Sequence, residues 1–152
     1  EAAIHRKPEK DASGKTLPDY REEYENTVRR QFNFVAYAPI LFISAKTGQR
    51  LPQVLDMALQ VKAERQHRVS TGVLNTAVQE AILRHNPPSD HGRQLKVLYA
   101  TQVGVEPPTI VFSVNDPRLL HFSYQRYLEN ELRQRFGFAG TPINLVFRKR
   151  GE

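Results

Sequence analysis

The sequence predicts an α+β fold, in which a helix-strand-helix segment precedes a helix-strand-strand-helix-strand domain. Apolar residues recur at helical spacing in four segments, and they alternate with other residues in three short segments of the second half. Clusters rich in proline and glycine separate these segments. We therefore expect two helices on one face of a three-stranded antiparallel sheet, with domains of residues 1–67 and 68–152.

The first half is expected to contain a loop, a helix, a strand and a second helix. Residues 5–16 are charged and aperiodic, which predicts an exposed loop. A helix should run from Pro18 to about Gln31, because a first-turn proline and the acidic residues after it favour a helix start. The residues that it should bury are Tyr20, Tyr24 and Val28.

An apolar run at residues 40–43, bounded by Pro39 and Gly48, predicts a buried strand. The next helix should run from Arg50 to about His67. The residues on its apolar face are Leu51, Val54, Leu55, Ala58 and Leu59.

The second half begins with a helix from Ser70 or Thr71 to about His85, and residues 86–92 then break the chain. Two strands should follow as a hairpin around the turn at residues 104–108. The alternating residues expected to point inward are Leu95, Val97 and Tyr99 on the first strand, and Ile110, Phe112 and Val114 on the second.

Asp116 and Pro117 predict the start of a long helix, which Gly137 and Gly140 should end. Its apolar residues recur every four positions, at Leu120, Tyr124, Leu128, Leu132 and Phe136. A last strand should follow, with Ile143, Leu145 and Phe147 alternating along it.

Composition restricts the possible chemistry. The chain has no cysteine, which excludes disulfides, thiolate catalysis and Cys-based metal sites and fits a cytoplasmic location. No apolar run approaches the roughly 20 residues of a membrane helix, so no membrane partner is expected. The net charge is +6, of which residues 68–152 contribute +4, from 11 Lys and Arg against 7 Asp and Glu. This charge is as compatible with simple solubility as with an anionic partner such as RNA.

Ser44, Ala45 and Lys46 follow the apolar run at residues 40–43. They resemble the last guanine-contacting motif of Ras-like GTPases, in which the alanine main-chain N–H reaches the base. The alternative is an ordinary turn between a strand and a helix. No G-x-x-x-x-G-K-[ST] phosphate-binding motif occurs in the chain.

Several further segments resemble one family, the EngA/Der bacterial tandem-domain ribosome-assembly GTPases, in that family's order over roughly residues 35–150. Residues 37–40 and 42–50 look like the end of its second GTPase domain. The segments similar to its C-terminal KH-like domain are 99–104 and 107–109 in the hairpin, 115–117, 121–124, 126–130 and 136–138 around the long helix, and 140–143 and 147–150 at the last strand.

The resemblance implies a KH-like α-β-β-α-β domain after a helix-strand-helix remnant of a P-loop GTPase domain. It also implies GTP or GDP with Mg²⁺ in the complete protein, which would be a monomer. The implied partners are rRNA of the large ribosomal subunit and the first GTPase domain of the same protein. Phosphate loops, switch segments and the Asn-Lys-x-Asp motif are absent here. We therefore expect the chain to begin inside the second GTPase domain, to need no cofactor itself, and neither to bind nor to hydrolyse GTP alone.

The candidate RNA-contacting residues are Arg93, Lys96, Arg148, Lys149 and Arg150. Their alternative role is that of an ordinary solvated surface and chain end. Residues 137–140 have the GXXG spacing of KH loops but lie between a helix and a strand, so we interpret them as a helix stop. The KH-like domain is therefore expected to read RNA shape and charge rather than sequence.

No catalytic or metal site is expected from the residue pattern, because the histidines lack metal-ligand spacing and Glu129 and Glu131 face apart on a helix. Tyr124 and Tyr127 are expected in the core, and His121 is expected to pack or to cap a helix. An alternative function is a purely intramolecular regulatory domain, which binds the first GTPase domain through its sheet face without contacting RNA. RNA binding should depend strongly on salt, whereas apolar docking should depend on it little.

Overall fold

The computed structural model describes residues 20–90 and 92–151, without the side chains of residues 20, 21 and 90. The loop predicted at residues 5–16 and the expected burial of Tyr20 lie outside this description. The chain packs as two compact units, residues 1–56 and 57–152, and the division falls inside helix α2 (Leu51–Gln66). The predicted domains of residues 1–67 and 68–152 stay a prediction.

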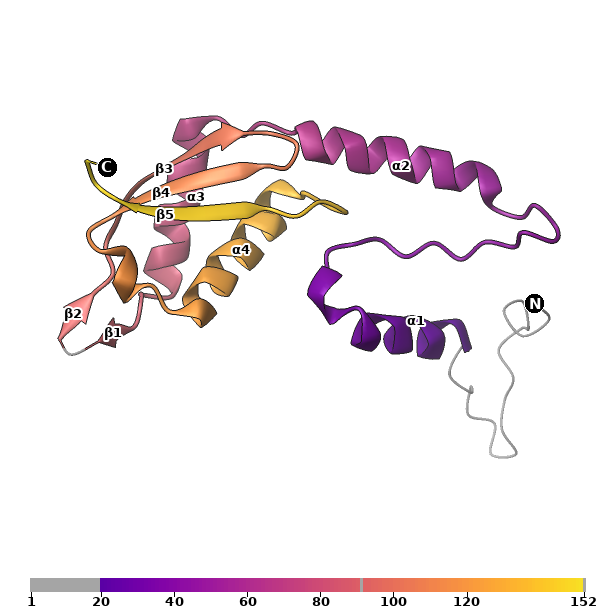
Figure 1. The fold of residues 1–152 in the computed structure, drawn as a ribbon, viewed down its shortest axis with the longest axis horizontal. Coiled ribbons are helices and arrows are strands. Elements are labelled where there is room, and N and C mark those ends of the chain that lie inside the picture. Colours follow the sequence, from indigo (N-terminus) through magenta and orange to yellow (C-terminus); the bar gives the residue numbers. More distant parts are fainter. Residues whose placement is uncertain (1–19, 91, 152) are drawn as a thin grey trace. The chain divides into compact units, whose positions relative to one another are not determined.

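In the first unit, α1 (Tyr20–Gln31) is followed by a short 3₁₀ helix, η1 (Asn33–Val35), and by an extended segment (Figure 1). Arg29 of α1 donates hydrogen bonds to the carbonyl oxygens of Ala36 and Ala38, at 3.1 and 2.8 Å. The ring of Tyr24 lies 6.3 Å from that of Phe42, centroid to centroid. The predicted first helix is thus confirmed, and it contacts the segment that follows it.

Two predictions for this unit are wrong. Residues 40–43 are extended but form no strand, because a strand needs backbone partners and no described segment pairs with them. Tyr24 is 64% exposed rather than buried. Hydrophobic periodicity therefore identified the helix correctly but did not determine whether its apolar residues are covered.

The same correction applies to α2, whose predicted helical extent is confirmed. The five residues of its predicted apolar face are all exposed, and Leu55 is 70% exposed. An amphipathic pattern records which face of a helix is apolar, but burial also requires a second surface. No element within the described part of the chain covers this face.

The second unit is an α+β domain whose two helices, α3 (Thr71–Arg84) and α4 (Phe122–Phe136), lie on one face of a sheet (Figure 1). The sheet contains β3 (Val97–Gly104), β4 (Thr109–Val114) and β5 (Asn144–Lys149), in the order β3-β4-β5. A two-residue ribbon, β1 (Ser89–Asp90) with β2 (Arg93–Gln94), lies where we predicted only a chain break.

The sheet is mixed and not antiparallel as expected. β3 and β4 form the predicted antiparallel hairpin, but β5 pairs with β4 in parallel. The reason is topological: the chain leaves the end of β4, crosses through α4, and returns to start β5 beside the start of β4. Two helices over one face of a three-stranded sheet remain as predicted.

The core of this unit lies between the helices and the inner face of the sheet. Ile110, Phe112 and Val114 of β4 are buried, as their alternation predicted. Phe112 also stacks on Phe147 of β5, with ring centroids 4.8 Å apart. The other buried apolar residues are Val69, Leu74, Ala77, Val78, Ala81, Leu95, Val97, Ala100, Tyr124, Leu128, Leu132, Phe138 and Ile143.

A β-bulge changes the direction of one predicted core residue. Val97 is in register with Val114, but Tyr99 is in register with Ser113, so Leu98 is an extra residue on β3. After an inserted residue the alternation changes face. Tyr99 therefore lies on the outer face, 46% exposed, whereas Ala100 takes the buried position.

The long helix also begins later than predicted. Asp116 caps a short 3₁₀ helix, η2 (Pro117–Leu119), by accepting a hydrogen bond from the Arg118 N–H at 3.1 Å. The chain then turns, and His121 caps α4 through Nδ1, which accepts from the Ser123 N–H at 3.2 Å. A capping role for His121 is thereby confirmed, and the single predicted helix is two helices.

Candidate functional site

The structure brings the predicted RNA-contacting residues to one end of the sheet. Lys96 precedes β3, and its carbonyl accepts from the Asn115 N–H at 3.1 Å, directly after β4. Arg148 and Lys149 are the register partners of Ser113 and Val114 on β4. The N–H of Arg150 donates to the Val114 carbonyl at 3.0 Å. Residues about fifty positions apart in the sequence are therefore neighbours, since β3 starts where β4 and β5 end.

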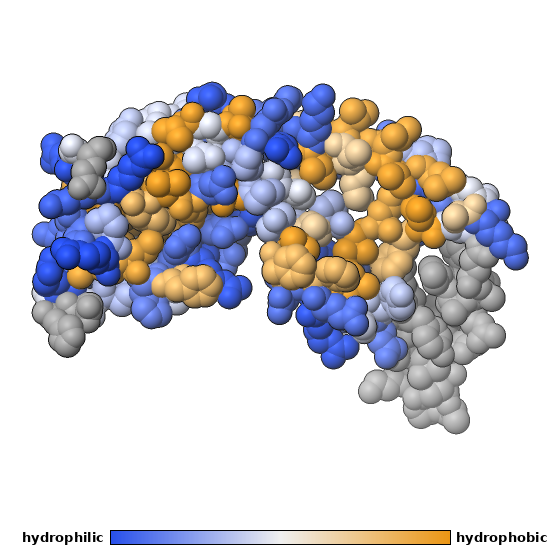
Figure 2. Space-filling view, in the orientation of Figure 1, coloured by the Kyte–Doolittle hydropathy of each residue, from blue (hydrophilic) through white to orange (hydrophobic). Residues whose placement is uncertain are grey.

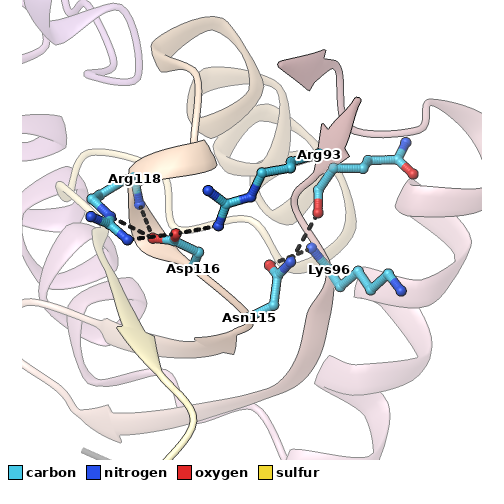
Figure 3. A network of polar contacts seen from close by, with 6 residues as sticks. Arg93, Lys96, Asn115, Asp116 and Arg118 are labelled. Atoms are coloured by element: carbon cyan, nitrogen blue, oxygen red, sulfur yellow. Dashed lines mark hydrogen bonds and ion pairs between the residues drawn. The ribbon is translucent and has the colours of Figure 1, made fainter. Parts of the chain in front are cut away.

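Asp116 draws two arginines to this end of the sheet (Figure 3). Its Oδ2 accepts from Arg93 Nη2 of β2 at 3.0 Å. Arg118 donates from Nε to Oδ1 and from Nη2 to Oδ2, both at 3.0 Å, which is a bidentate ion pair. The Asp116 side chain is only 12% exposed, whereas that of Arg118 is 86% exposed. One largely covered carboxylate thus holds two guanidinium groups at the surface.

The electrostatics of Asp116 keep this arrangement charged. The side-chain hydrogen bond from Arg118, and then the backbone hydrogen bond from the same residue, lower the pKa of the Asp116 carboxyl from 3.8 to about 2. Asp116 is therefore ionised at any pH near neutrality, and its pairing with Arg118 raises the pKa of that guanidinium in turn.

Asn115 fixes the chain that leads into β3 (Figure 3). Its Oδ1 accepts from the Lys96 N–H at 2.8 Å, and its Nδ2 donates to the Gln94 carbonyl at 2.9 Å. These two bonds occupy both ends of the amide, so the backbone that carries Arg93 and Lys96 is tied to the end of β4.

We call the resulting cluster the basic end, which consists of Arg93, Lys96, Arg118, Arg148, Lys149 and Arg150. Arg118 was missed by sequence reasoning, which assigned Asp116 and Pro117 only to a helix start. The signal was available, because an acidic cap two residues before an arginine can pair with it. Six cations with one carboxylate among them form a surface suited to several phosphate groups.

Ser44, Ala45 and Lys46 lie in a turn of the first unit. The Ser44 N–H donates to the Gln49 carbonyl at 3.1 Å, and Ser44 Oγ accepts from the Thr47 N–H at 3.2 Å. Ala45 and Lys46 are exposed. The turn therefore presents its small residue on the surface, and the guanine contact implied by the family resemblance stays a prediction.

The GXXG-like segment at residues 137–140 is a helix stop, as predicted. Gly137 ends α4 with φ at +84°, and its N–H donates to the Arg133 carbonyl at 2.9 Å. The Phe138 side chain is fully buried, and the Phe138 N–H donates to Glu64 Oε2 at 2.6 Å. A segment anchored in this way is not the exposed loop with which KH domains clamp nucleotides.

Tyr124 is buried in the core, as predicted, and Tyr127 is partly buried and packs against the core. Their hydroxyls donate to the carbonyls of His85 and Ala81, at 3.0 and 2.7 Å. Burial raises the pKa of Tyr124 to about 12.

The carboxylates of α4 serve as structural ion-pair partners: Glu129 pairs with Arg133, and Glu131 pairs with Arg84. Within residues 20–90 and 92–151, no group of three or more His, Cys, Asp or Glu side chains is placed to hold a metal ion. No helix in that part of the chain has both the length and the apolar character needed to cross a bilayer.

Comparison with known proteins gives a consistent family. Residues 68–148, more than half of the chain, match the model described as KH-domain-like of EngA bacterial GTPase enzymes, C-terminal. The chain is 55% identical over 129 residues to the GTPase Der of Desulfitobacterium hafniense, which covers 85% of this chain and 29% of that protein. It is 56% identical over 135 residues to the GTPase Der of Moorella thermoacetica, covering 89% of this chain and 30% of the relative.

The GTPase Der of Ligilactobacillus salivarius is 46% identical over 136 residues, with coverage of 90% and 30%. The chain thus spans about three tenths of the length of the curated relatives that it matches. The matched segment contains the whole β3-β4-β5 sheet except Lys149, together with α3 and α4. On this sequence match and this fold, the chain belongs to the EngA family of bacterial GTPases and carries its C-terminal KH-like domain.

Proposed function

We propose that the KH-like domain contacts rRNA, as the C-terminal portion of a GTP-hydrolysing ribosome biogenesis factor that acts on the large ribosomal subunit. The observation that carries this proposal is the basic end, where six cationic residues from three segments of the sequence lie at one end of the sheet. Phosphates are recognised by such clusters of Arg and Lys, and Arg in particular binds them in a bidentate manner.

The contact is with RNA backbone and shape rather than with a specific sequence. Phosphate contacts provide affinity and orientation but carry no base information. The buried Phe138 in the GXXG-like segment supports this reading, since the loop with which other KH domains hold single strands is replaced here by a helix stop.

The first half of the chain is part of this proposal. Residues 1–67 form the end of the second GTPase domain, and Ser44, Ala45 and Lys46 contact guanine in the complete protein. GTP or GDP and Mg²⁺ bind there through segments that this sequence does not contain, so the chain by itself neither binds nor hydrolyses GTP. The complete protein works as a cytoplasmic monomer, and its KH-like domain also docks on the first GTPase domain.

The experiment is a salt titration of RNA binding by the 152-residue chain, with fragments of large-subunit rRNA as the probe. A triple variant, Arg148→Gln, Lys149→Gln and Arg150→Gln, removes three cations at the basic end. Each lost phosphate contact makes the plot of log affinity against log salt less steep, by about 0.9 for a B-form duplex and about 0.7 for a single strand. We expect the slope to fall by about 2 to 3, with a loss of affinity of about 10- to 100-fold at low salt.

The matched control is Lys62→Gln, Arg68→Gln and Arg126→Gln, which removes the same charge from α2, the α2–α3 connection and α4. We expect this control to change the slope by less than the loss of one phosphate contact would. An equal effect of the two triple variants would mean that only net charge matters, and it would refute a localised RNA site. Unchanged binding by both variants would refute the phosphate contacts altogether.

A further inference from the structure

We propose that the outer face of the sheet, beside the basic end, binds unpaired RNA bases, with Tyr99 as the stacking surface and Arg148 beside it. This inference rests on the proposed RNA contact and extends it, because it adds a class of RNA, single-stranded or bulged nucleotides. It assigns a role to the face of the sheet opposite α3 and α4.

The register places three polar side chains in one row across the sheet. Tyr99 of β3 is paired with Ser113 of β4, and Ser113 is paired with Arg148 of β5. Directly paired residues project from the same face of a sheet. Tyr99 and Arg148 are therefore two strand spacings apart, roughly 9–10 Å. The small Ser113 between them leaves room above the strand for a planar ring.

The bulge at Leu98 is what gives Tyr99 this position. Without the extra residue, Tyr99 would share the inward face of Val97, as the alternating pattern predicted. With it, Tyr99 becomes exposed at the end of the sheet where Lys96 and the last residues of β5 lie. β-Bulges commonly redirect a side chain beside functional sites.

Among the described residues, those on the rest of the outer face form no ion pair. The row next to Tyr99 consists of Thr101, Val111 and Val146, all half-buried and β-branched. Figure 2 shows this face of the second unit, with apolar residues over the strands and hydrophilic residues at the end of the sheet near the C-terminus. A base stacked on Tyr99 would meet apolar surface on one side and cations on the other.

Tyr99 and Arg148 also differ from comparable residues in having no internal partner. Tyr124 and Tyr127 use their hydroxyls to bind backbone carbonyls, and Arg93 and Arg118 pair with Asp116. Throughout the described ranges, neither Tyr99 nor Arg148 has a side-chain hydrogen bond, ion pair or ring contact. Binding a base and a phosphate here would break no interaction within the domain.

An aromatic ring next to a cationic track is the arrangement with which proteins bind single-stranded nucleic acids without sequence preference, because every base offers a flat face. A protein partner is less well matched, since the row at the basic end combines a guanidinium with two hydroxyls. We therefore assign the outer face to bases, and docking of a protein domain on it becomes an outcome of the test.

The test compares binding of a uridine 12-mer and of an RNA duplex of the same length to the 152-residue chain. Tyr99→Leu should weaken binding of the 12-mer by about 5- to 100-fold and change binding of the duplex by less than about twofold. Tyr99→Phe should retain binding, since the ring and not the hydroxyl stacks. The slope of log affinity against log salt should be unchanged in Tyr99→Leu. In Arg148→Gln it should become less steep by the amount that corresponds to one phosphate contact.

Phe122→Leu is the matched control, because it removes an exposed aromatic ring from α4, on the other side of the domain. It should leave binding of both RNAs unchanged. Circular dichroism of each variant shows whether it is folded. Should Tyr99→Leu be destabilised, Tyr99→Thr takes its place in the comparison, because it also lacks the ring and has a high strand propensity.

The outcomes separate this inference from the proposed function. If the wild-type chain binds both RNAs and Tyr99→Leu binds the 12-mer as well as the wild type does, stacking is overturned and the RNA contact stands. If the wild-type chain binds neither RNA, the proposed function itself fails. If Tyr99→Leu loses binding only to the GTPase domains of the complete protein, the outer face docks protein and the inference is wrong.

Discussion

The two units of this chain share the same kind of hydrophobic periodicity, but among the described residues the periodic apolar side chains are buried only in the second unit. In the first unit, none of the described side chains from Glu22 to Asp56 is buried, although its helices and its apolar run were predicted from hydrophobic periodicity. In the second unit the same periodicity coincides with a core in which Leu74, Ile110 and Phe112 are fully buried. Periodicity therefore predicts an element and its apolar face, whereas burial depends on what lies opposite.

The difference extends to polar side chains. In the second unit, Gln102 accepts from the Val69 N–H at 2.7 Å and donates to the His67 carbonyl at 2.9 Å. Asn75 of α3 exchanges two hydrogen bonds with the backbone of Ala100 on β3. Such contacts join distant parts of the sequence and contribute most when they are shielded from water. In the first unit, by contrast, Arg29 bonds to Glu25 and Ala38, which lie four and nine residues away along the chain.

The largest expected effect tests this contrast directly. Phe112→Ala removes a fully buried ring that stacks on Phe147, and we expect the second unit to lose about 3–5 kcal/mol of unfolding free energy. Hydrogen exchange of the β4 backbone amides measures that free energy without interference from the first unit.

Leu55→Ala is the counterpart in the exposed face of α2. Leu55 is 70% exposed, so its truncation should change the opening free energy that hydrogen exchange of the α2 backbone amides measures by less than about 0.5 kcal/mol. Equal losses for the two variants would show that the α2 face is covered in solution, and the contrast between the units would fail.

The second prediction compares two glycines with positive φ, one in each unit. A Cβ on Gly137 would lie 2.9 Å from Glu64 Oε2, the atom that accepts the Phe138 N–H. Gly137→Ala should therefore cost the second unit about 2–3 kcal/mol, from backbone strain together with a weakened hydrogen bond. A Cβ on Gly48 meets nothing within 4 Å, so Gly48→Ala adds only the strain, about 1–2 kcal/mol, in the first unit.

Hydrogen exchange again separates the two effects. Protection of the α4 and β4 amides should fall in Gly137→Ala and stay unchanged in Gly48→Ala. Glu64→Ala combined with Gly137→Ala isolates the steric contribution, because Glu64→Ala removes the atoms that the new Cβ would meet. If the double variant loses as much as the sum of the single variants, the contact between Gly137 and Glu64 is not what makes alanine costly.

Much of the fold follows from the sequence because local patterns encode it. The α+β class, the helix positions, the hairpin and the glycine stop after α4 are set by spacing, turns and caps. Three features depended on non-local information. The parallel pairing of β5 is a consequence of the α4 crossover, the exposure of Tyr99 depends on one inserted residue, and residues 40–43 lack a pairing strand.

The candidate site was predictable in part. The sequence alone identifies Lys and Arg residues as candidates for contact with phosphates. The register of the strands then shows that Lys96 and Arg148 lie at the same end of the sheet. Arg118 could not be assigned from charge alone, because its place depends on the ion pair with Asp116. Tyr99 was assigned to the core, since a β-bulge has no strong sequence signal.

The smallest expected effect concerns Asp116 and the pH dependence of the second unit. The pKa of this carboxyl is lowered in the folded state, so the stability that its ionised form contributes is fully present above the ordinary value of 3.8. That contribution is lost as pH falls through about 2, and between pH 8 and 5 Asp116 should add no pH dependence. NMR of the Asp116 carboxyl carbon during an acid titration measures its midpoint directly.

Variants of the two arginine partners of Asp116 test the cause of its lowered pKa in the same titration. Hydrogen bonds from Arg118 are the largest cause of the lowered pKa of Asp116, and the positive charge of Arg93 is the smallest cause, although Arg93 also donates to Asp116 Oδ2 at 3.0 Å. Arg118→Gln should therefore move the pKa of Asp116 most of the way back toward 3.8, and Arg93→Gln should move it less. A larger effect of Arg93→Gln would mean that the ion pair between Arg93 and Asp116 is the main cause of the lowered pKa. Arg118 would then be held at the basic end by something other than the carboxylate.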